Sequence, residues 1–134
     1  MDSDVRKFSF ENLDVYNTAR ELVVNIYKLQ NTFPKEERYA LGDQIRRSAI
    51  SITSNIAEGC GRNSIKEKIR FIEIAFASLT ESFSQLQIAQ DLGYVSEHDI
   101  EELCPVFNKA AALLSILRKS YERKMDENVK PLNF

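Results

Sequence analysis

The chain has 134 residues, of which 43% are hydrophobic and 28% charged, and its formal net charge is −2. These values are typical of a single globular domain, and with no run of about 20 apolar residues and no signal-peptide pattern we expect a cytoplasmic protein that does not enter a membrane. Two cysteines and one histidine are too few to suggest a metal site, so we expect no cofactor. Only four Gly and three Pro are present, which predicts a few long elements joined by short turns.

The first helix is predicted over residues 13–31. Its apolar residues recur at spacings of three and four, as they do on the buried side of a helix. The helix should end before Pro34, because the residue that precedes a proline is disfavoured in helical conformation. Residues 1–11 are polar and predict a loose N-terminal arm, with Phe8 and Phe10 as candidate anchors.

A second helix is predicted over residues 36–59, with two glutamates in its first turn, where acidic side chains are favourable. The stretch Gln44–Arg62 carries the most informative pattern of the chain. Its apolar stripe consists of Ile45, Ala49, Ile52 and Ile56. The helix is expected to stop at Gly59 and Gly61, because glycine tolerates the left-handed conformation that commonly ends a helix.

The third helix is predicted over residues 65–92 and should open with a capping box, in which Ser64 and Glu67 each satisfy a free backbone donor. A second stripe of small and apolar residues lies beside its main seam. More than half of the circumference is therefore apolar or small, which predicts cover on two sides. The main seam follows the spacing of a helical bundle: Ile69, Ile72, Phe76, Leu79, Phe83 and Leu86.

The fourth helix is predicted over residues 97–124, capped by Ser96 and Asp99 and kinked by the proline within it. Four helices with turns of a few residues predict an all-α fold, an up-down-up-down antiparallel four-helix bundle. We expect this bundle domain to span residues 12–125 and to be followed by an irregular tail over residues 126–134.

This topology gathers basic residues at one end of the bundle. Residues 35–70 carry eight Lys/Arg against five Asp/Glu, whereas residues 71–107 carry seven acids and no Lys or Arg. The end where the second helix finishes and the third begins, here named the basic pole, collects Arg6, Lys7, Arg62, Lys66, Lys68, Arg70, Arg118, Lys119, Arg123 and Lys124. The opposite end, the acidic pole, collects Asp91, Glu97, Asp99, Glu101 and Glu102, partly offset by Lys35 and Arg38.

Two interpretations of the basic pole remain open. Bases at the end of the fourth helix and acids at its start complement the helix dipole without any ligand. The third helix departs from that rule, with bases near its start and Asp91 near its finish, and a local positive potential attracts a polyanion. On this second interpretation the candidate nucleic-acid contacts are Arg46, Arg47, Arg62, Lys66, Arg70, Lys119 and Arg123.

Other polar and small residues on the second and third helices predict contacts between helices. A polar network is expected to fix the packing, with direct ligand contact as the alternative; its members would be Arg47, Asn55, Glu58 and Glu81. Sides of these helices that a surface helix would keep polar are candidates for contact with another subunit: Ile50, Ala57, Phe71, Ile74, Ala75, Ser78 and Ser82.

The combined motifs resemble a known family. They are Phe10…Leu13-x-x-Tyr16-x-x-Ala19, Phe33-Pro34-x-x-Glu37-x-Tyr39-x-Leu41, Gln44-Ile45-Arg46-Arg47-Ser48-Ala49, Ser51-Ile52, Asn55-Ile56-Ala57-Glu58-Gly59, the residues Ala75, Ser78 and Glu81, and Leu92-Gly93-Tyr94. From about Phe10 to Leu117 the chain resembles the four-helix-bundle family of 23S rRNA intervening sequences, also labelled S23 ribosomal protein-like. It is also similar to the accessory protein of diversity-generating retroelements, a pentameric bundle implicated in nucleic-acid and reverse-transcriptase binding.

The resemblance implies a small bundle that assembles as a homopentamer and whose biochemical role is not defined. Together with the basic pole it predicts a non-catalytic oligomer that binds RNA or DNA. The alternative is a protein–protein interaction scaffold, in which the acidic pole or the third helix binds a partner protein. An enzyme ranks last, because the Glu-x-x-His pairs of metal-binding bundles are absent around Glu58 and Glu81, and His98 lies in an acidic helix start.

Overall fold

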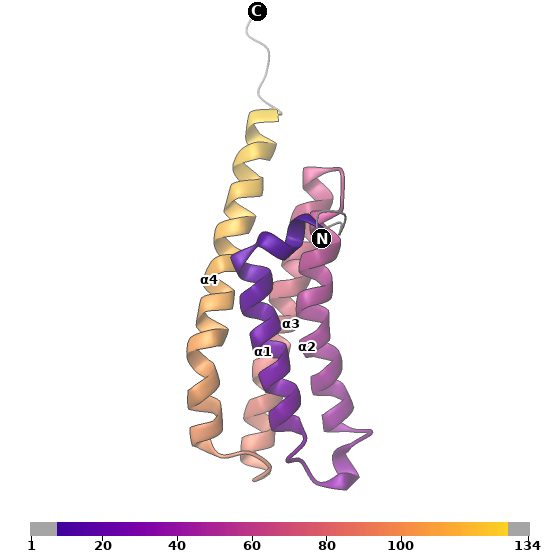
Figure 1. Ribbon diagram of the computed structural model, residues 1–134, viewed down its shortest axis with the longest axis vertical. Helices are drawn as coiled ribbons and strands as arrows, with labels where there is room; N and C mark the ends of the chain where they lie inside the picture. The colour runs from indigo at the N-terminus through magenta and orange to yellow at the C-terminus, as the bar shows by residue number, and fades with distance from the viewer. Residues whose placement is uncertain (1–7, 129–134) are drawn as a thin grey trace, which may run out of the picture.

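The computed structural model describes residues 8–128 as one antiparallel bundle of helices (Figure 1). Each helix contacts its neighbours in chain order, and the last closes against the first. The predicted all-α, up-down-up-down four-helix bundle is confirmed, and residues 8–128 contain no strand. The elements are η2 (Ser9–Asn12), α1 (Asp14–Gln30), η3 (Lys35–Glu37), α2 (Leu41–Cys60), α3 (Ile65–Asp91) and α4 (Glu97–Asn128).

The core consists of the apolar stripes that the spacing predicts. The α2 stripe is fully buried, with no exposed surface at Ile45, Ala49, Ile52 or Ile56. Burying one isoleucine side chain contributes about 1.5–3 kcal/mol, so this stripe is a main source of stability. The α3 seam is buried less evenly, because Phe76 turns to the surface and is 39% exposed.

Small polar side chains fill the contact between α2 and α3. The Ser82 hydroxyl lies 2.9 Å from the Ser48 hydroxyl, which in turn donates to Gln85 Oε1 at 2.7 Å. One turn away the hydroxyls of Ser51 and Ser78 are 2.7 Å apart. Because these side chains are short, the two helices approach closely and every hydroxyl still has a partner.

The start of α2 differs from the prediction. Residues 35–37 form the separate 3₁₀ turn η3, and the helix begins only at Leu41, after Ala40 adopts a non-helical backbone with φ −120° and ψ −109°. The reason is a local cap, since the Glu37 carboxylate accepts a hydrogen bond from the Leu41 backbone N–H at 3.1 Å. The other carboxylate oxygen of Glu37 accepts from Tyr94 Oη at 3.1 Å, and this bond raises the pKa of Tyr94.

Two of the predicted helix ends are also corrected. Gly61 follows α2 with φ −85°, a conformation open to any residue, so the predicted left-handed end of this helix is wrong. Within residues 8–128 the left-handed glycine is Gly93, which follows α3 and has φ +80°. At the start of α3 the Ser64 hydroxyl accepts from the Glu67 N–H at 3.1 Å, but the Glu67 carboxylate bonds to Arg70 rather than to the Ser64 backbone. The predicted cap of α4 is complete, with reciprocal bonds of 2.9 and 3.0 Å between Ser96 and Asp99.

The last helix is longer than expected. It stays helical through Pro105 and continues to Asn128, beyond the predicted end at residue 124 and into the segment expected to be an irregular tail. Figure 1 shows that its final turns extend past the ends of the other helices. In the N-terminal arm Phe10 is anchored on the Tyr16 ring, with centroids 4.7 Å apart, whereas Phe8 is 63% exposed. Residues 1–7 and 129–134, including Arg6 and Lys7, lie outside the described residues.

Within residues 8–128, none of the helices combines the length and apolar character needed to cross a bilayer.

Candidate nucleic-acid interface

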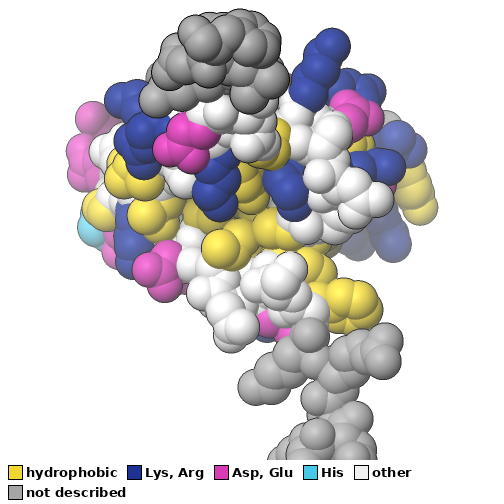
Figure 2. All heavy atoms as spheres, turned by 90° about the horizontal axis from the view of Figure 1, so that it is seen from above, with side chains coloured by type: hydrophobic (Ala, Val, Ile, Leu, Met, Phe, Trp, Pro, Cys, Tyr) yellow, Lys and Arg dark blue, Asp and Glu magenta, His cyan; other side chains and the backbone are white. Residues whose placement is uncertain are grey.

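The structure brings the described members of the basic pole to one end of the bundle. Lys68 Nζ on α3 lies 3.0 Å from the Cys60 carbonyl oxygen at the end of α2 and 5.9 Å from the Tyr121 ring centroid on α4. Arg118 of α4 pairs with Glu73 of α3 at 3.5 Å. Seen from this end, Lys and Arg side chains are spread over the face with Asp and Glu between them (Figure 2). The positive charge is therefore distributed rather than concentrated in one patch.

An aromatic ring in contact with two guanidinium groups is the most distinctive feature of the basic pole. The Cζ atoms of Arg62 and Arg70 lie 4.7 and 5.4 Å from the centroid of the Phe71 ring. Arg62 also pairs with Glu58 at 2.6 Å, and Arg70 with Glu67 at 3.3 Å. Exposed pairs on one helix contribute only about 0.3–0.5 kcal/mol, so a phosphate group could replace either carboxylate at little cost.

The remaining bases of this pole divide into two groups. Arg118 bridges Glu73 and Glu122, and Lys68 donates to the last carbonyl groups of α2, which stabilises that helix end. The second group is exposed and forms no ion pair with any of residues 8–128: Lys66, Lys119, Arg123 and Lys124. This second group includes three of the predicted phosphate contacts.

Arg46 and Arg47 do not join the other candidates. They lie in the first turns of α2, and the helix runs another fourteen residues from Arg46 to its end at Cys60, or about 21 Å along the axis, before the chain reaches Arg62. Arg47 pairs with Asp43 at 3.0 Å and is largely exposed, whereas Arg46 is partly buried. The predicted set of seven nucleic-acid contacts is therefore divided between the two ends of the molecule.

The predicted polar network is not assembled within one subunit. Arg47, Asn55, Glu58 and Glu81 instead bond along their own helices, to Asp43, Ser51, Arg62 and Gln85 respectively. The network that does join α2 to α3 was missed, although serines spaced three or four apart on both helices signal it: Ser48, Ser51, Ser78, Ser82 and Gln85. Short side chains reach across this contact because the helices are close, and the longer charged ones turn outward to water.

The candidate subunit contacts also divide in two. Ala75, Ser78 and Ser82 are 0%, 7% and 0% exposed within the α2–α3 contact, so their assignment to an intersubunit surface is corrected. Ile50 and Ile74 are 44% and 36% exposed, and Ala57 and Phe71 are partly exposed. Two further exposed apolar residues were missed, Ile88 of α3 and Leu92, which directly follows that helix.

Two ionisable side chains near the basic pole, Cys60 and Tyr121, have pKa values that burial raises. Burial raises the pKa of the Cys60 thiol, against the opposing effects of Lys68 and of a hydrogen bond with Tyr121. Burial likewise raises the pKa of Tyr121. A thiol with a raised pKa is protonated at neutral pH and is a weak nucleophile. In the described part of the chain no cluster of three or more His, Cys, Asp or Glu side chains could hold a metal ion.

Comparison with known proteins identifies the family. The model of the 23S rRNA-intervening sequence protein family matches residues 11–116, most of the chain. The chain belongs to this family. Its fold is similar to the crystal structure of a protein of unknown function from the S23 ribosomal protein family of Bacteroides thetaiotaomicron VPI-5482, with a TM-score of 0.72 and 24% identity over 78% of this chain and 98% of that one. No curated protein matches the chain.

Proposed function

We propose that this intervening-sequence family member is a non-catalytic oligomeric bundle that binds RNA through its basic pole. The observation that carries this proposal is the Phe71 ring at the start of α3, with the guanidinium groups of Arg62 and Arg70 lying 4.7 and 5.4 Å from its centroid. Guanidinium groups bind phosphate oxygens, and aromatic and guanidinium planes stack on the splayed bases of single-stranded RNA. Helix dipoles alone would favour acids, not bases, at the start of α3.

The exposed bases supply the second part of the argument. Lys66 stands one turn before Arg70 on α3, and Lys119 and Arg123 stand one turn apart in the last third of α4. None of the three is neutralised by a carboxylate within residues 8–128. These side chains are thus available to phosphates without first breaking an ion pair.

Self-assembly would strengthen a contact of this kind. Residues 48–57 of α2 include no charged side chain, yet Ile50 is 44% exposed and Ser54 and Ala57 also reach the surface. They form an uncharged face of α2 that a neighbouring subunit would cover, and Ile74 is a further exposed apolar residue on α3. The family resemblance implies five subunits. A closed homopentamer would present five basic poles on one side and multiply a weak contact by avidity.

Charge reversal tests RNA binding. The triple variant R62E/K66E/R123E should lower affinity for a single-stranded RNA by about a hundredfold or more and reduce the dependence on salt, by roughly 0.7 in the log–log slope for each lost phosphate contact. The matched control R20E/K28E/K109E changes the net charge equally, at exposed sites outside the basic pole. Equal affinities of the two variants in fluorescence anisotropy would overturn the proposal.

Solution mass tests the oligomer. Ile50→Glu places a charge on the uncharged face and should reduce the mass to that of a subunit, because a buried unpaired carboxylate is costly. Val24→Glu is the control, since Val24 is 52% exposed on α1 and lies outside that face. If light scattering gives the mass of a monomer for the unmodified protein, the proposed homopentamer is wrong.

A protein–protein scaffold is the second candidate. Ile88 and Leu92, 49% and 54% exposed, lie at the end of α3 beside Asp91 and close to the acids that begin α4. An apolar pair within an acidic surface suits a basic amphipathic partner segment. RNA affinity that is insensitive to the triple charge reversal, combined with normal assembly, would favour this function.

A further inference from the structure

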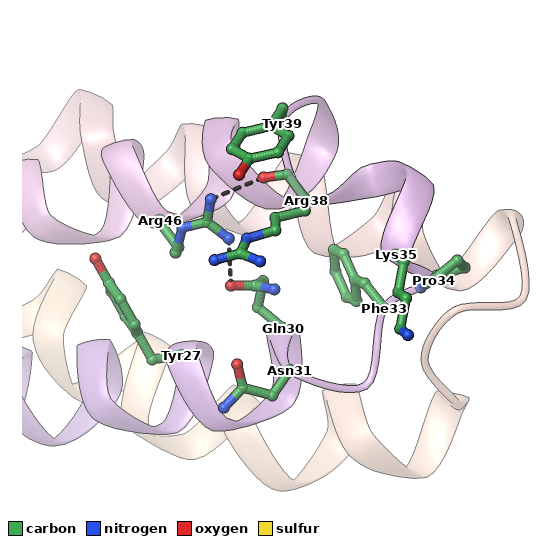
Figure 3. A pocket seen from close by; sticks show the side chains of 9 residues that line it. All are labelled: Tyr27, Gln30, Asn31, Phe33, Pro34, Lys35, Arg38, Tyr39 and Arg46. Atoms are coloured by element: carbon green, nitrogen blue, oxygen red, sulfur yellow. Dashed lines mark hydrogen bonds between the residues drawn. The ribbon is translucent and has the colours of Figure 1, made fainter.

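A hollow lies at the opposite end of the bundle from the basic pole, between the end of α1, η3 and the start of α2 (Figure 3). Its volume is about 570 Å³. Three cationic side chains line it, Lys35, Arg38 and Arg46, and no carboxylate does. A concentration of like charge at the end that is otherwise acidic requires an explanation.

Arg46 is held in a fixed position in this hollow. Its Nη1 donates to Gln30 Oε1 at 2.6 Å and its Nη2 to the Arg38 carbonyl oxygen at 2.8 Å. Gly42 makes room for it, since a Cβ there would lie 3.3 Å from Arg46 Nη1. The guanidinium group is thus oriented before any ligand arrives, which reduces the entropy that binding costs.

The positive charge of the hollow is poorly compensated. Asp43 is the one carboxylate of residues 8–128 within 4.0 Å of the Arg46 guanidinium, at 3.8 Å, and it makes its shorter contact with Arg47 at 3.0 Å. Glu37, although next to Arg38 in sequence, bonds to the Leu41 N–H and Tyr94. Figure 3 shows the guanidinium groups of Arg38 and Arg46 directed into the same space, beside Gln30.

Neutral groups of the hollow add features that a simple anion would not use. Gln30 is only 8% exposed, and its Nε2 donates to no group of residues 8–128, so a donor remains for a ligand. Tyr27 and Tyr39 also line the hollow, and Tyr39 is 83% exposed with the Arg38 guanidinium 5.5 Å from its ring centroid. An exposed ring beside a cation suits the stacking of a planar base.

We propose that this hollow binds a nucleotide, either free or at the phosphorylated end of a strand. Arg38 and Arg46 bind the terminal phosphate monoester, Lys35 adds charge at the rim, and Tyr39 stacks on the base. The volume falls within the range of about 300–1,000 Å³ that is usual for small-molecule sites. The site is separate from the basic pole and does not depend on it.

Calorimetry with AMP, adenosine and inorganic phosphate tests this assignment on the full chain. We expect AMP to bind, adenosine to bind at least tenfold more weakly, and Arg38→Gln to weaken AMP by about tenfold or more. Arg38→Gln keeps the backbone carbonyl that Arg46 needs, so the hollow should persist. Arg20→Gln is the matched control and should leave AMP affinity unchanged, because Arg20 is an exposed arginine beside the Tyr16 ring on α1, outside both proposed sites.

Tyr39→Ala separates the two parts of the ligand. It should weaken AMP and leave inorganic phosphate unaffected. The proposal is overturned if AMP and a 5′-phosphorylated oligonucleotide both fail to bind, if adenosine binds as well as AMP, or if Arg38→Gln leaves AMP affinity unchanged. Tighter binding of the 5′-phosphorylated oligonucleotide than of AMP would identify a strand end, and the reverse order a free nucleotide. R62E/K66E/R123E should leave AMP affinity unchanged, so failure of the RNA-binding proposal would be recognised separately.

Discussion

The two ends of the bundle both carry arginines, but the protein holds them in different ways. Arg46 bonds to a buried amide and a backbone carbonyl, both neutral, and its side chain is 24% exposed. Arg62 pairs with an exposed carboxylate and stacks on Phe71, and its side chain is 43% exposed. A neutral, partly buried partner fixes an arginine, whereas an exposed carboxylate can be exchanged for another anion. The residue type alone therefore does not reveal which function an arginine serves.

The largest difference between the two ends should appear at their glycines. Gly42→Ala places a Cβ 2.7 Å from the Glu37 carbonyl oxygen, so the backbone of η3 must shift, and we expect a loss of about 1–3 kcal/mol in the free energy of unfolding. At the other end, Gly61→Ala brings its Cβ no closer than 3.6 Å to Glu58 and keeps an allowed backbone. Its stability should be unchanged or slightly raised. Urea denaturation of the two variants measures the contrast, and equal stabilities would show that η3 does not pack on α2.

Methionine substitutions compare the arginines themselves. Arg46→Met leaves the Gln30 amide and the Arg38 carbonyl oxygen without their partner, which should cost about 1–3 kcal/mol. Arg62→Met loses an exposed ion pair and a cation–π contact, which together should cost no more than about 1 kcal/mol. Urea denaturation of both variants measures the two losses in the free energy of unfolding. A larger loss for Arg62→Met would reverse the comparison.

The salt concentration should affect the stabilities of the same two variants differently. Raising NaCl from about 0.1 to 1 M shortens the Debye length from about 10 to 3 Å. The small destabilisation of Arg62→Met should then shrink towards zero, because it includes an exposed ion pair. The destabilisation of Arg46→Met should persist, since Arg46 bonds to neutral groups; disappearance of both would indicate that Asp43 is its effective partner.

The smallest effect is expected from pH at the acidic pole. The Ser96 backbone N–H and then its hydroxyl lower the pKa of Asp99 below its ordinary value of about 3.9. A carboxyl whose pKa is lower in the folded state stabilises the fold above the unfolded pKa, and this stability is lost as pH falls through the folded pKa. Asp99→Asn should therefore remove a small part of the acid sensitivity below about pH 4. Identical acid unfolding curves of Asp99→Asn and the unmodified protein would show that the cap does not contribute.

Much of the fold could be predicted from the sequence because helical spacing reports burial directly. The stripe of Ile45, Ala49, Ile52 and Ile56 is the buried side of α2, and the cap at Ser96 was placed correctly. The start of α2 was predicted too early, since a proline followed by glutamates is equally compatible with a short 3₁₀ turn. That choice depends on the contact of Glu37 with Leu41 and Tyr94, and Tyr94 is 57 residues away in the chain.

The sites were less predictable, because spacing does not specify how each helix is rotated. Ala75, Ser78 and Ser82 could face either the next helix or the next subunit, and the structure places them inside the subunit. Arg46 was predicted to bind nucleic acid together with the bases of the other pole. It lies instead in the hollow, which could not be predicted from spacing because residues from three elements form it. A tyrosine and glutamine three apart, Tyr27 and Gln30, were the available signal for that hollow.

The serine contacts between α2 and α3 also determine how the two helices are aligned along their axes. Ser48 faces Ser82, and Ser51 faces Ser78. A slide by one helical turn, about 5.4 Å, would bring one serine of each helix opposite the other and leave the remaining two serines without a serine partner. Each interhelical hydrogen bond lost in this way would cost about 0.5–1.5 kcal/mol. Apolar stripes tolerate such a slide, because any aliphatic side chain can replace another, so the serines select a single register from several that hydrophobic packing alone would permit.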